Sequence, residues 1–225
     1  VIFLHCSGYL KNDTNFGNYF GKMYQPRYLS GLAAGAMTDS NKIGYVAAFP
    51  IPEVIRGINA FATGVKEVNP DATVEVVWTF TWFGPEAETQ AANALLETGV
   101  DVLAQHQDSP STGIAAEAAG AKWISYNTAY GQDAAPGAFV TAPVWDWGPY
   151  YVEMVESIIN DEFVAEAYWG GMETGLVSLY ELTSDVPTET ASLISDRTEE
   201  IISGSYDPPI VEEEFIDNVI GTVNP

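Results

Sequence analysis

Four short groups of aromatic and polar residues follow apolar runs of this chain. They are Thr81 to Gly84, His106 to Pro110, Asn127 to Tyr130 and Trp145 to Trp147. They supply flat rings, a carboxylate, a carboxamide and hydroxyls, and a mostly apolar pocket with a few such polar groups is the usual small-molecule site. A nucleobase fits this set, because an indole stacks on its ring while carboxylate and amide groups pair with its edges.

We expect most of the binding from two tryptophans, one aspartate and one asparagine, with three neighbours in lesser roles. The first set is Trp82, Asp108, Asn127 and Trp145, and the second is Phe83, Ser109 and Trp147. Each has an alternative structural role. A tryptophan is more often a core residue, Asp108 could cap a helix over 111–120, and Asn127 could be a turn residue.

No catalytic motif is visible in the chain. There is no glycine-rich dinucleotide or phosphate loop, no nucleophile elbow and no zinc-protease motif. His106 has no second histidine or cysteine at ligand spacing, so a loop or core histidine is favoured over a metal ligand. We therefore expect binding without catalysis, and neither a metal nor a cofactor.

The elements that must position these groups begin with a βαβ unit. An apolar strand covers 43–49, a helix has its apolar residues on one side between 54 and 65, and a β-branched strand covers 74–78. A near-continuous apolar strand indicates a parallel sheet covered on both faces. Ligands of such sheets bind beyond the carboxyl ends of the strands.

Strands and helices continue to alternate as far as residue 142. Strands are expected over 100–105, 122–126 and 138–142, and helices over 86–98, 111–120 and 149–160. Before the βαβ unit we expect a strand over 1–6, a loop over 10–18 and a helix over 19–37, in which Gly31 and Gly35 allow close packing. Beyond 160 a strand over 176–182, a helix over 188–203 and an acidic tail over 206–225 are expected.

The domain organisation follows from this alternation. Residues 41–145 form one complete α/β lobe, whereas 1–40 and 146–225 belong to a second lobe and the hinge. Because the chain begins at Val1, inside an apparent strand and without a leader sequence, we expect that lobe to be N-terminally truncated.

Charge and composition limit the partners. The formal charge is −23, from 31 acidic and 8 basic residues, which argues against nucleic acid because phosphate is held by lysine and arginine. Hydrophobic residues make up 47% of the chain, enough for a sizeable core. No apolar run reaches the roughly 18 residues of a membrane span. Cys6 is the single cysteine, so no internal disulfide can form.

Several stretches together resemble the basic membrane protein (BMP) family. They are 41–60 (NKIGYVAAFPIPEVIRGINA), 78–85 (WTFTWFGP), 104–110 (AQHQDSP) and 144–151 (VWDWGPYY). The family comprises substrate-binding proteins of ABC transporters and is related to purine nucleoside receptor lipoproteins. The resemblance implies a type I periplasmic binding protein fold with two Rossmann-like lobes, a purine ligand, a membrane permease as partner, a monomer, and a periplasmic or lipid-anchored location.

The resemblance also sharpens the expected site. Trp82 falls where relatives place an aromatic residue on the base, and Asp108 and Asn127 fall on loops that supply polar contacts. Trp145 falls near a lysine that serves the ribose in relatives. An indole cannot replace an ammonium group, which favours a free base such as adenine. Ala129 stands where relatives usually carry an acidic residue, so the resemblance does not carry that contact over to this chain.

Three alternative functions stay open. The same family could take a nucleoside or a flavin, and the same fold could be the ligand-sensing module of a receptor or transcription regulator. A purine-processing enzyme is the third reading, and the missing catalytic residues weigh against it.

Overall fold

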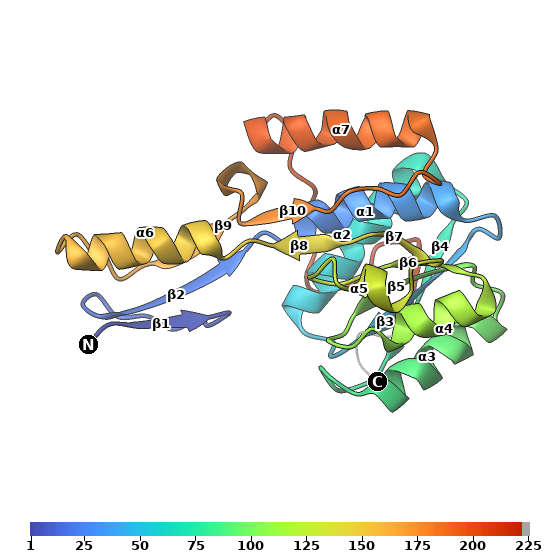
Figure 1. The fold of residues 1–225 in the computed structure, drawn as a ribbon, viewed down its shortest axis with the longest axis horizontal. Coiled ribbons are helices and arrows are strands. Elements are labelled where there is room, and N and C mark those ends of the chain that lie inside the picture. The colour runs from blue at the N-terminus through green and yellow to red at the C-terminus, as the bar shows by residue number, and fades with distance from the viewer. Residues whose placement is uncertain (222–225) are drawn as a thin grey trace.

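A six-stranded parallel sheet forms the centre of the larger part of the molecule (Figure 1). The structure, a computed structural model, describes residues 1–221. In sheet order the strands are β11 (Val219–Ile220), β4 (Thr73–Trp78), β3 (Lys42–Ala47), β5 (Val102–His106), β6 (Lys122–Ile124) and β7 (Phe139–Thr141). This confirms the expected parallel α/β architecture between 42 and 142.

Helices cover both faces of this sheet. One face carries α1 (Tyr24–Met37) and α2 (Pro52–Val68), and the other carries α3 (Pro85–Glu97), α4 (Ser111–Ala119) and the short α5 (Gly131–Ala134). Successive side chains of β3 show why: Tyr45 packs in the core on the α1 and α2 side, and Val46 packs on the α3 and α4 side. A strand buried on both faces needs apolar residues at every position, which is the pattern in the sequence.

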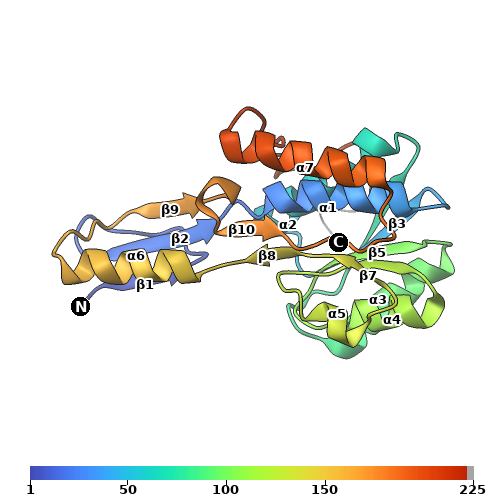
Figure 2. The same cartoon turned by 45° about the horizontal axis from the view of Figure 1, so that its top comes forward.

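A smaller three-stranded sheet projects from one side of this body (Figures 1 and 2). It consists of the parallel strands β1 (Phe3–Cys6), β2 (Phe16–Gly21) and β9 (Ala167–Gly170), with α6 (Gly148–Ile159) beside it. The antiparallel pair β8 (Pro143–Trp145) and β10 (Val177–Leu179) lies between the two parts, and the 3₁₀ turn η1 (Met172–Thr174) follows β9.

Strand β2 corrects the sequence expectation of a loop over 10–18 and a helix from 19. The structure has a strand over Phe16–Gly21, and α1 begins only at Tyr24. The glycines that indicated a loop serve close packing instead. A Cβ at Gly21 would lie 2.3 Å from the Trp145 ring, and one at Gly17 would lie 2.9 Å from the carbonyl oxygen of Glu166.

Helices α1 and α2 pack at very short range through glycine. A Cβ at Gly31 would lie 2.0 Å from the Phe61 carbonyl oxygen, and one at Gly64 would lie 2.1 Å from the Tyr28 carbonyl oxygen. The expected role of Gly31 in close packing is therefore confirmed. This contact also ties α1 to the larger sheet, although α1 lies within 1–40. The lobe boundary at residue 40 stays a prediction, and this packing favours a boundary near the end of β2.

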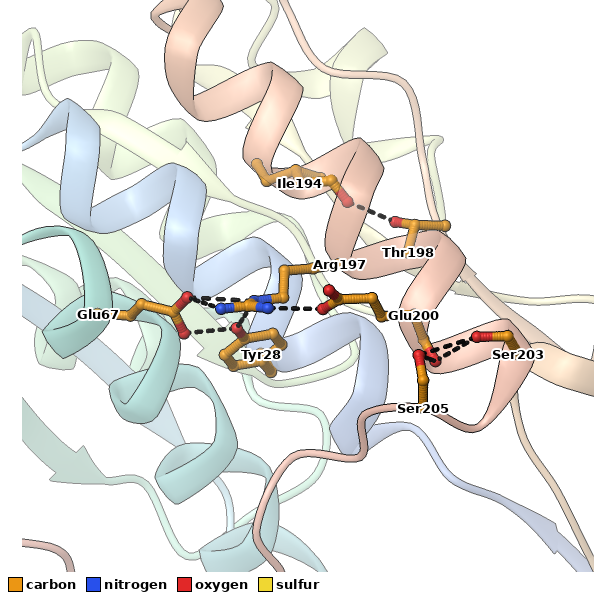
Figure 3. Close-up of polar contacts among 8 residues, drawn as sticks. All are labelled: Tyr28, Glu67, Ile194, Arg197, Thr198, Glu200, Ser203 and Ser205. Carbon is orange, nitrogen blue, oxygen red and sulfur yellow. Dashed lines mark hydrogen bonds and ion pairs between the residues drawn. The ribbon is translucent and has the colours of Figure 1, made fainter.

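Helix α7 (Thr188–Ser203) forms an outer layer over α1 (Figure 1). Figure 3 shows Arg197 of α7 lying between two carboxylates. Its Nη2 donates to Glu67 Oε1 at 2.7 Å and its Nη1 donates to Glu200 Oε2 at 2.6 Å. The Tyr28 hydroxyl donates to the other oxygen of Glu67 at 2.6 Å. One guanidinium group thus joins α7 to both α1 and α2.

The segment after α7 returns along α2 to the larger sheet. The side-chain Nδ2 of Asn59 donates hydrogen bonds to the carbonyl oxygens of Val211 and Glu214, at 3.0 and 2.8 Å. Strand β11 then pairs with β4. The expected acidic tail over 206–225 therefore packs along α2 and joins the larger sheet as far as residue 221. Residues 222–225 lie outside the described residues. Within residues 1–221, no helix is long and apolar enough to cross a membrane.

Candidate ligand-binding site

The carboxyl ends of β3, β4, β5 and β6 meet at one edge of the larger sheet because these strands are parallel. At the end of β3, Ala47 pairs with Trp78 of β4 and with His106 of β5. Beyond the strands, the backbone N–H of Asp108 donates to the carbonyl oxygen of Trp82 at 2.9 Å. The two loops expected to bind ligand therefore touch.

A cavity of about 200 Å³ opens between the loops that follow β5 and β6. Three residues expected from the sequence, Asp108, Ser109 and Asn127, lie in its wall. The wall also contains Gln107, which belongs to the expected group 106–110 but had no expected role, and Gln105 and Tyr126, which the sequence did not single out. These loops therefore form one concave surface at the strand ends, where a parallel sheet binds its ligand.

Trp82 lies beside this cavity in a group of aromatic side chains. Its ring centroid is 5.5 Å from that of Phe49 and 5.9 Å from that of His106, and 37% of the residue is exposed. Phe83, next to it, is 64% exposed. Phe80 adopts a positive φ of 55°, which is uncommon for an aromatic residue and is found more often at functional sites. The loop after β4 thus presents flat apolar surface to solvent.

Trp145 and Trp147 lie in a different aromatic group. They stack on each other with ring centroids 4.5 Å apart. Trp145 is 5.1 Å from Phe20 and Trp147 is 5.4 Å from Tyr19, both on β2. Within residues 1–221, no ring contact joins this group to Trp82. The structure therefore places Trp82, Asp108, Ser109 and Asn127 together and puts the two later tryptophans at the junction with the smaller sheet.

Buried polar atoms without partners are concentrated at this edge of the sheet. Nine such side-chain atoms occur in residues 1–221, and six belong to four residues here: Arg27, His106, Gln107 and Asn127. Buried polar groups in proteins are nearly always hydrogen-bonded, because an unpaired one costs about 1–3 kcal/mol. Such a concentration at strand ends is typical of a site that receives a polar ligand.

Arg27 is the most unexpected member of the site. It is only 2% exposed, and its Nη1 donates to the Tyr45 hydroxyl at 2.6 Å and to the Gln105 carbonyl oxygen at 3.2 Å. The guanidinium carbon lies 4.8 Å from the centroid of the Tyr126 ring, a cation–π distance. A lone arginine among the apolar residues of α1 was a signal that sequence reasoning did not use.

His106 lies between Trp82 and Tyr126, and its ring centroid is 4.6 Å from that of Tyr126. Its Nε2 is 3.5 Å from Glu53 Oε1 at the start of α2. Burial and the charge of Arg27 lower the pKa of His106 to about 4, so the ring is neutral near pH 7. Among residues 1–221, no cluster of histidine, cysteine and carboxylate side chains is arranged to hold a metal ion.

The alternative roles of the expected residues can be compared with the structure. Helix α4 begins after Pro110 without a side-chain cap, so Asp108 does not cap it. Burial and the charge of Glu53 raise the pKa of Asp108. Asn127 adopts a positive φ of 58°, as its turn role requires, and its Oδ1 is still buried and unpaired. The Asp108 side chain therefore does not serve as a helix cap, whereas Asn127 does serve as a turn residue.

Two buried side chains hold the loops in place. Glu88 of α3 is fully buried, and its oxygens accept from the Gly84 N–H at 3.0 Å and from the Ser109 hydroxyl at 2.5 Å. The Gln105 amide donates to the carbonyl oxygens of Gln107 and Ser109, both at 2.8 Å. The loops after β4 and β5 are therefore fixed relative to each other before any ligand arrives.

Comparison with known proteins identifies the family. The family model described as ABC transporter substrate-binding protein PnrA-like, the Bmp family, matches residues 1–209. This chain belongs to that family. The BMP resemblance seen in the sequence is thereby confirmed, and the family is one of solute-binding proteins.

Two curated relatives differ in the ligand that their names give. A Haloferax volcanii protein, provisionally described as an ABC transporter glucose-binding protein, is 44% identical over 207 residues, which are 92% of this chain and 52% of the relative. A purine-binding protein of Brucella abortus is 36% identical over 213 residues, which are 92% of this chain and 59% of the relative. The chain thus spans between half and three fifths of these relatives.

Solved structures show the same fold. An ABC transporter solute-binding protein from Conexibacter woesei matches with a TM-score of 0.74 at 23% identity, over 93% of this chain and 72% of that one. A solute-binding protein from Aeropyrum pernix matches with a TM-score of 0.80 at 15% identity, over 92% and 71%. The fold is that of type I periplasmic binding proteins, as the sequence resemblance implied.

Proposed function

We propose that this protein captures a purine, preferably adenine as the free base, for import by an ABC transporter. The observation that carries this proposal is the set of unpaired buried polar atoms beside Trp82 at the strand ends. A purine offers a flat face for the indole and polar edges for Gln107, Asp108 and Asn127. The purine-binding relative from Brucella supports the same ligand class.

Four of the residues that the sequence predicts have proposed roles in this site. Trp82 stacks on the base, Asp108 and Asn127 accept hydrogen bonds from its edge, and Ser109 supports the loop that carries Asp108. Phe83 extends the exposed apolar surface beside Trp82. The proposed roles of Trp145 and Trp147 are at the closing side, because they lie where the smaller sheet joins the body.

The family supports the wider role proposed here. In this proposal the protein is a monomer of two lobes that is exported to the periplasm or held at the membrane by a lipid. The two lobes close on the ligand, and the closed form docks on a permease. A sensory role for the same fold is the alternative, and a receptor or regulator domain joined to this chain would favour it. Catalysis has no proposed part in this function.

Glucose is the second candidate ligand, because the Haloferax relative is the more similar of the two and its name gives that sugar. The two ligands make different demands on the site. A sugar ring presents hydroxyl groups around its whole rim, whereas a purine presents polar atoms only at its edges and needs a flat surface against its face. The exposed ring of Trp82 favours the purine.

Calorimetric titration of the protein with adenine, adenosine, riboflavin and glucose tests this proposal. We expect adenine to give the lowest Kd of the four. A lower Kd for adenosine would keep the purine class but remove the argument from Trp145 for a free base. Saturation by glucose or riboflavin alone would contradict the purine proposal and leave the family assignment intact.

A further inference from the structure

Gln107 has its carboxamide fixed in one orientation. Its Nε2 donates to the Thr79 hydroxyl at 2.5 Å, and that hydroxyl lies 3.2 Å from the Ala47 carbonyl oxygen and 3.1 Å from the Thr81 carbonyl oxygen. A hydroxyl has one proton, and a carbonyl can only accept it, so Thr79 gives its proton to a carbonyl and receives one from Gln107. The amide nitrogen is therefore at Thr79, which leaves Oε1 as the free atom of Gln107.

That free atom is an acceptor that has already lost its water. Gln107 is 1% exposed, lines the cavity between the β5 and β6 loops, and its Oε1 has no partner in the part of the chain that the structure describes. The cost of removing this oxygen from water is therefore carried by the folded protein. A ligand N–H that reaches it gains the hydrogen bond without paying that cost again.

The neighbouring free groups are acceptors too. The Asp108 carboxylate lines the same cavity and is exposed. Among residues 1–221, Glu53 is the charged group that acts on it, and no hydrogen bond or cation lowers its pKa. Asn127 Oδ1 is also unpaired. The nearby donors are occupied: Gln105 Nε2 serves two carbonyl oxygens, and Trp123 Nε1 donates to Gln105 Oε1 at 3.1 Å. The cavity therefore offers free acceptor oxygens from Gln107, Asp108 and Asn127, while the donors of Gln105 and Trp123 are already used.

We propose that Gln107 and Asp108 are specificity-determining residues that select a ligand edge rich in N–H donors, such as the amino group of a 6-aminopurine, over the carbonyl of a 6-oxopurine. The inference rests on the proposed purine function and deepens it. A 6-oxopurine replaces the two N–H donors of the amino group with a carbonyl oxygen and keeps one ring N–H at N1, so at least one of these acceptors faces an oxygen and stays unpaired. We expect such a ligand to bind on the order of 10- to 100-fold more weakly.

The test uses adenine and hypoxanthine as probes in calorimetric titrations, and the quantity compared is the ratio of their Kd values within each variant. That ratio cancels any loss of stability or folded fraction that affects both bases equally. In Thr79→Val the hydroxyl that orients Gln107 is gone, so its amide is free to turn and present N–H. In Asp108→Asn an acceptor-only group gains a donor. We expect both variants to lower the preference for adenine by about 10-fold or more.

Matched controls separate orientation from general damage. Thr79→Ser keeps the hydroxyl and is expected to retain the wild-type ratio. Thr63→Val, in the C-terminal half of α2, and Asp71→Asn, on the exposed loop before β4, make the same chemical changes away from the cavity. Both are expected to leave the ratio unchanged.

The possible results distinguish a failure of the specificity role of Gln107 and Asp108 from a failure of the proposed purine function. Equal binding of both bases by the wild-type protein, or an unchanged preference in both Thr79→Val and Asp108→Asn, overturns this inference while the purine proposal stands. Failure of both bases to bind overturns the proposed function and this inference with it.

Discussion

At the scale of single residues, His106 and Arg27 share an interior that holds a permanent positive charge. The Arg27 guanidinium has two nitrogens without partners, and both ring nitrogens of His106 also lack hydrogen-bond partners. Glu53 is the carboxylate that approaches His106, at 3.5 Å. A second cation here would be unfavourable, which is why the site keeps its histidine neutral.

The lowered pKa of His106 predicts acid-sensitive stability. Its pKa is about 4 in the folded protein and about 6.5 in an unfolded chain. Between these values the unfolded chain binds more protons, so stability falls as the pH drops through about 6.5 and the loss is complete below about 4. From about pH 7.5 to about pH 5.5, this residue alone is expected to remove about 1 kcal/mol.

Denaturant unfolding at the two pH values measures this effect. The variant His106→Phe keeps a ring of similar size that cannot titrate, so its free energy of unfolding is expected to change less between the two pH values than that of the wild type. His5 is the chain's other histidine and is exposed, and His5→Phe is the matched control. Equal pH dependence in all three proteins would show that His106 is not the group responsible.

At the scale of elements, the α1 and α2 contact depends on glycine. Because a Cβ at Gly31 would lie 2.0 Å from a carbonyl oxygen of α2, Gly31→Ala must push the helices apart. We expect it to destabilise the fold by about 3 kcal/mol, although alanine is the better helix former by about 1 kcal/mol.

Thermal or urea unfolding of Gly31→Ala checks this prediction. The matched control is Ala36→Gly, later in the same helix and partly exposed, which is expected to cost only the propensity difference of about 1 kcal/mol. If Gly31→Ala were as stable as the wild type, the close helix contact would be wrong.

The attachment of α7 makes a second prediction at this scale. Arg197 bonds Glu67, Glu200 and the Tyr28 hydroxyl at once. Because Arg197→Met leaves a partly buried carboxylate without its cation, we expect a loss of about 1–2 kcal/mol in the free energy of unfolding. The exposed pair between Lys122 and Asp185 provides the comparison: Lys122→Met is expected to cost no more than about 0.5 kcal/mol. Equal losses in the two variants would contradict a special role for Arg197.

At the scale of the whole molecule, the sequence predicts the larger sheet well and the smaller sheet poorly. Strands buried on both faces have continuous apolar runs in the sequence, and the helices between them have apolar residues on one side only. These two patterns predict the strands and helices of residues 42–142. Strand β2 (Phe16–Gly21) contains glycine and asparagine because its neighbours pack close to its backbone, and that composition is typical of a loop.

The candidate site divides in the same way. Asp108 and Asn127 were predicted because they follow strands directly, and parallel strands bring their ends together. Arg27 could not be found by that rule, since it comes from a helix before the sheet and reaches the site only through packing. The place of Gln107 depends on a hydrogen bond to Thr79, 28 residues away in the chain. The roles assigned to all of these residues stay predictions.

The most direct test of the account is a calorimetric titration with adenine of the wild-type protein, Trp82→Ala and Trp169→Ala. Trp169 on β9 has a similar exposed fraction, 41% against 37% for Trp82, and lies outside the site. We expect saturable binding by the wild type and by Trp169→Ala, and a Kd raised about 10-fold or more in Trp82→Ala, because stacking on a base contributes about 1–3 kcal/mol. Unchanged affinity in Trp82→Ala, or no adenine binding by the wild type, would contradict a purine site at these strand ends.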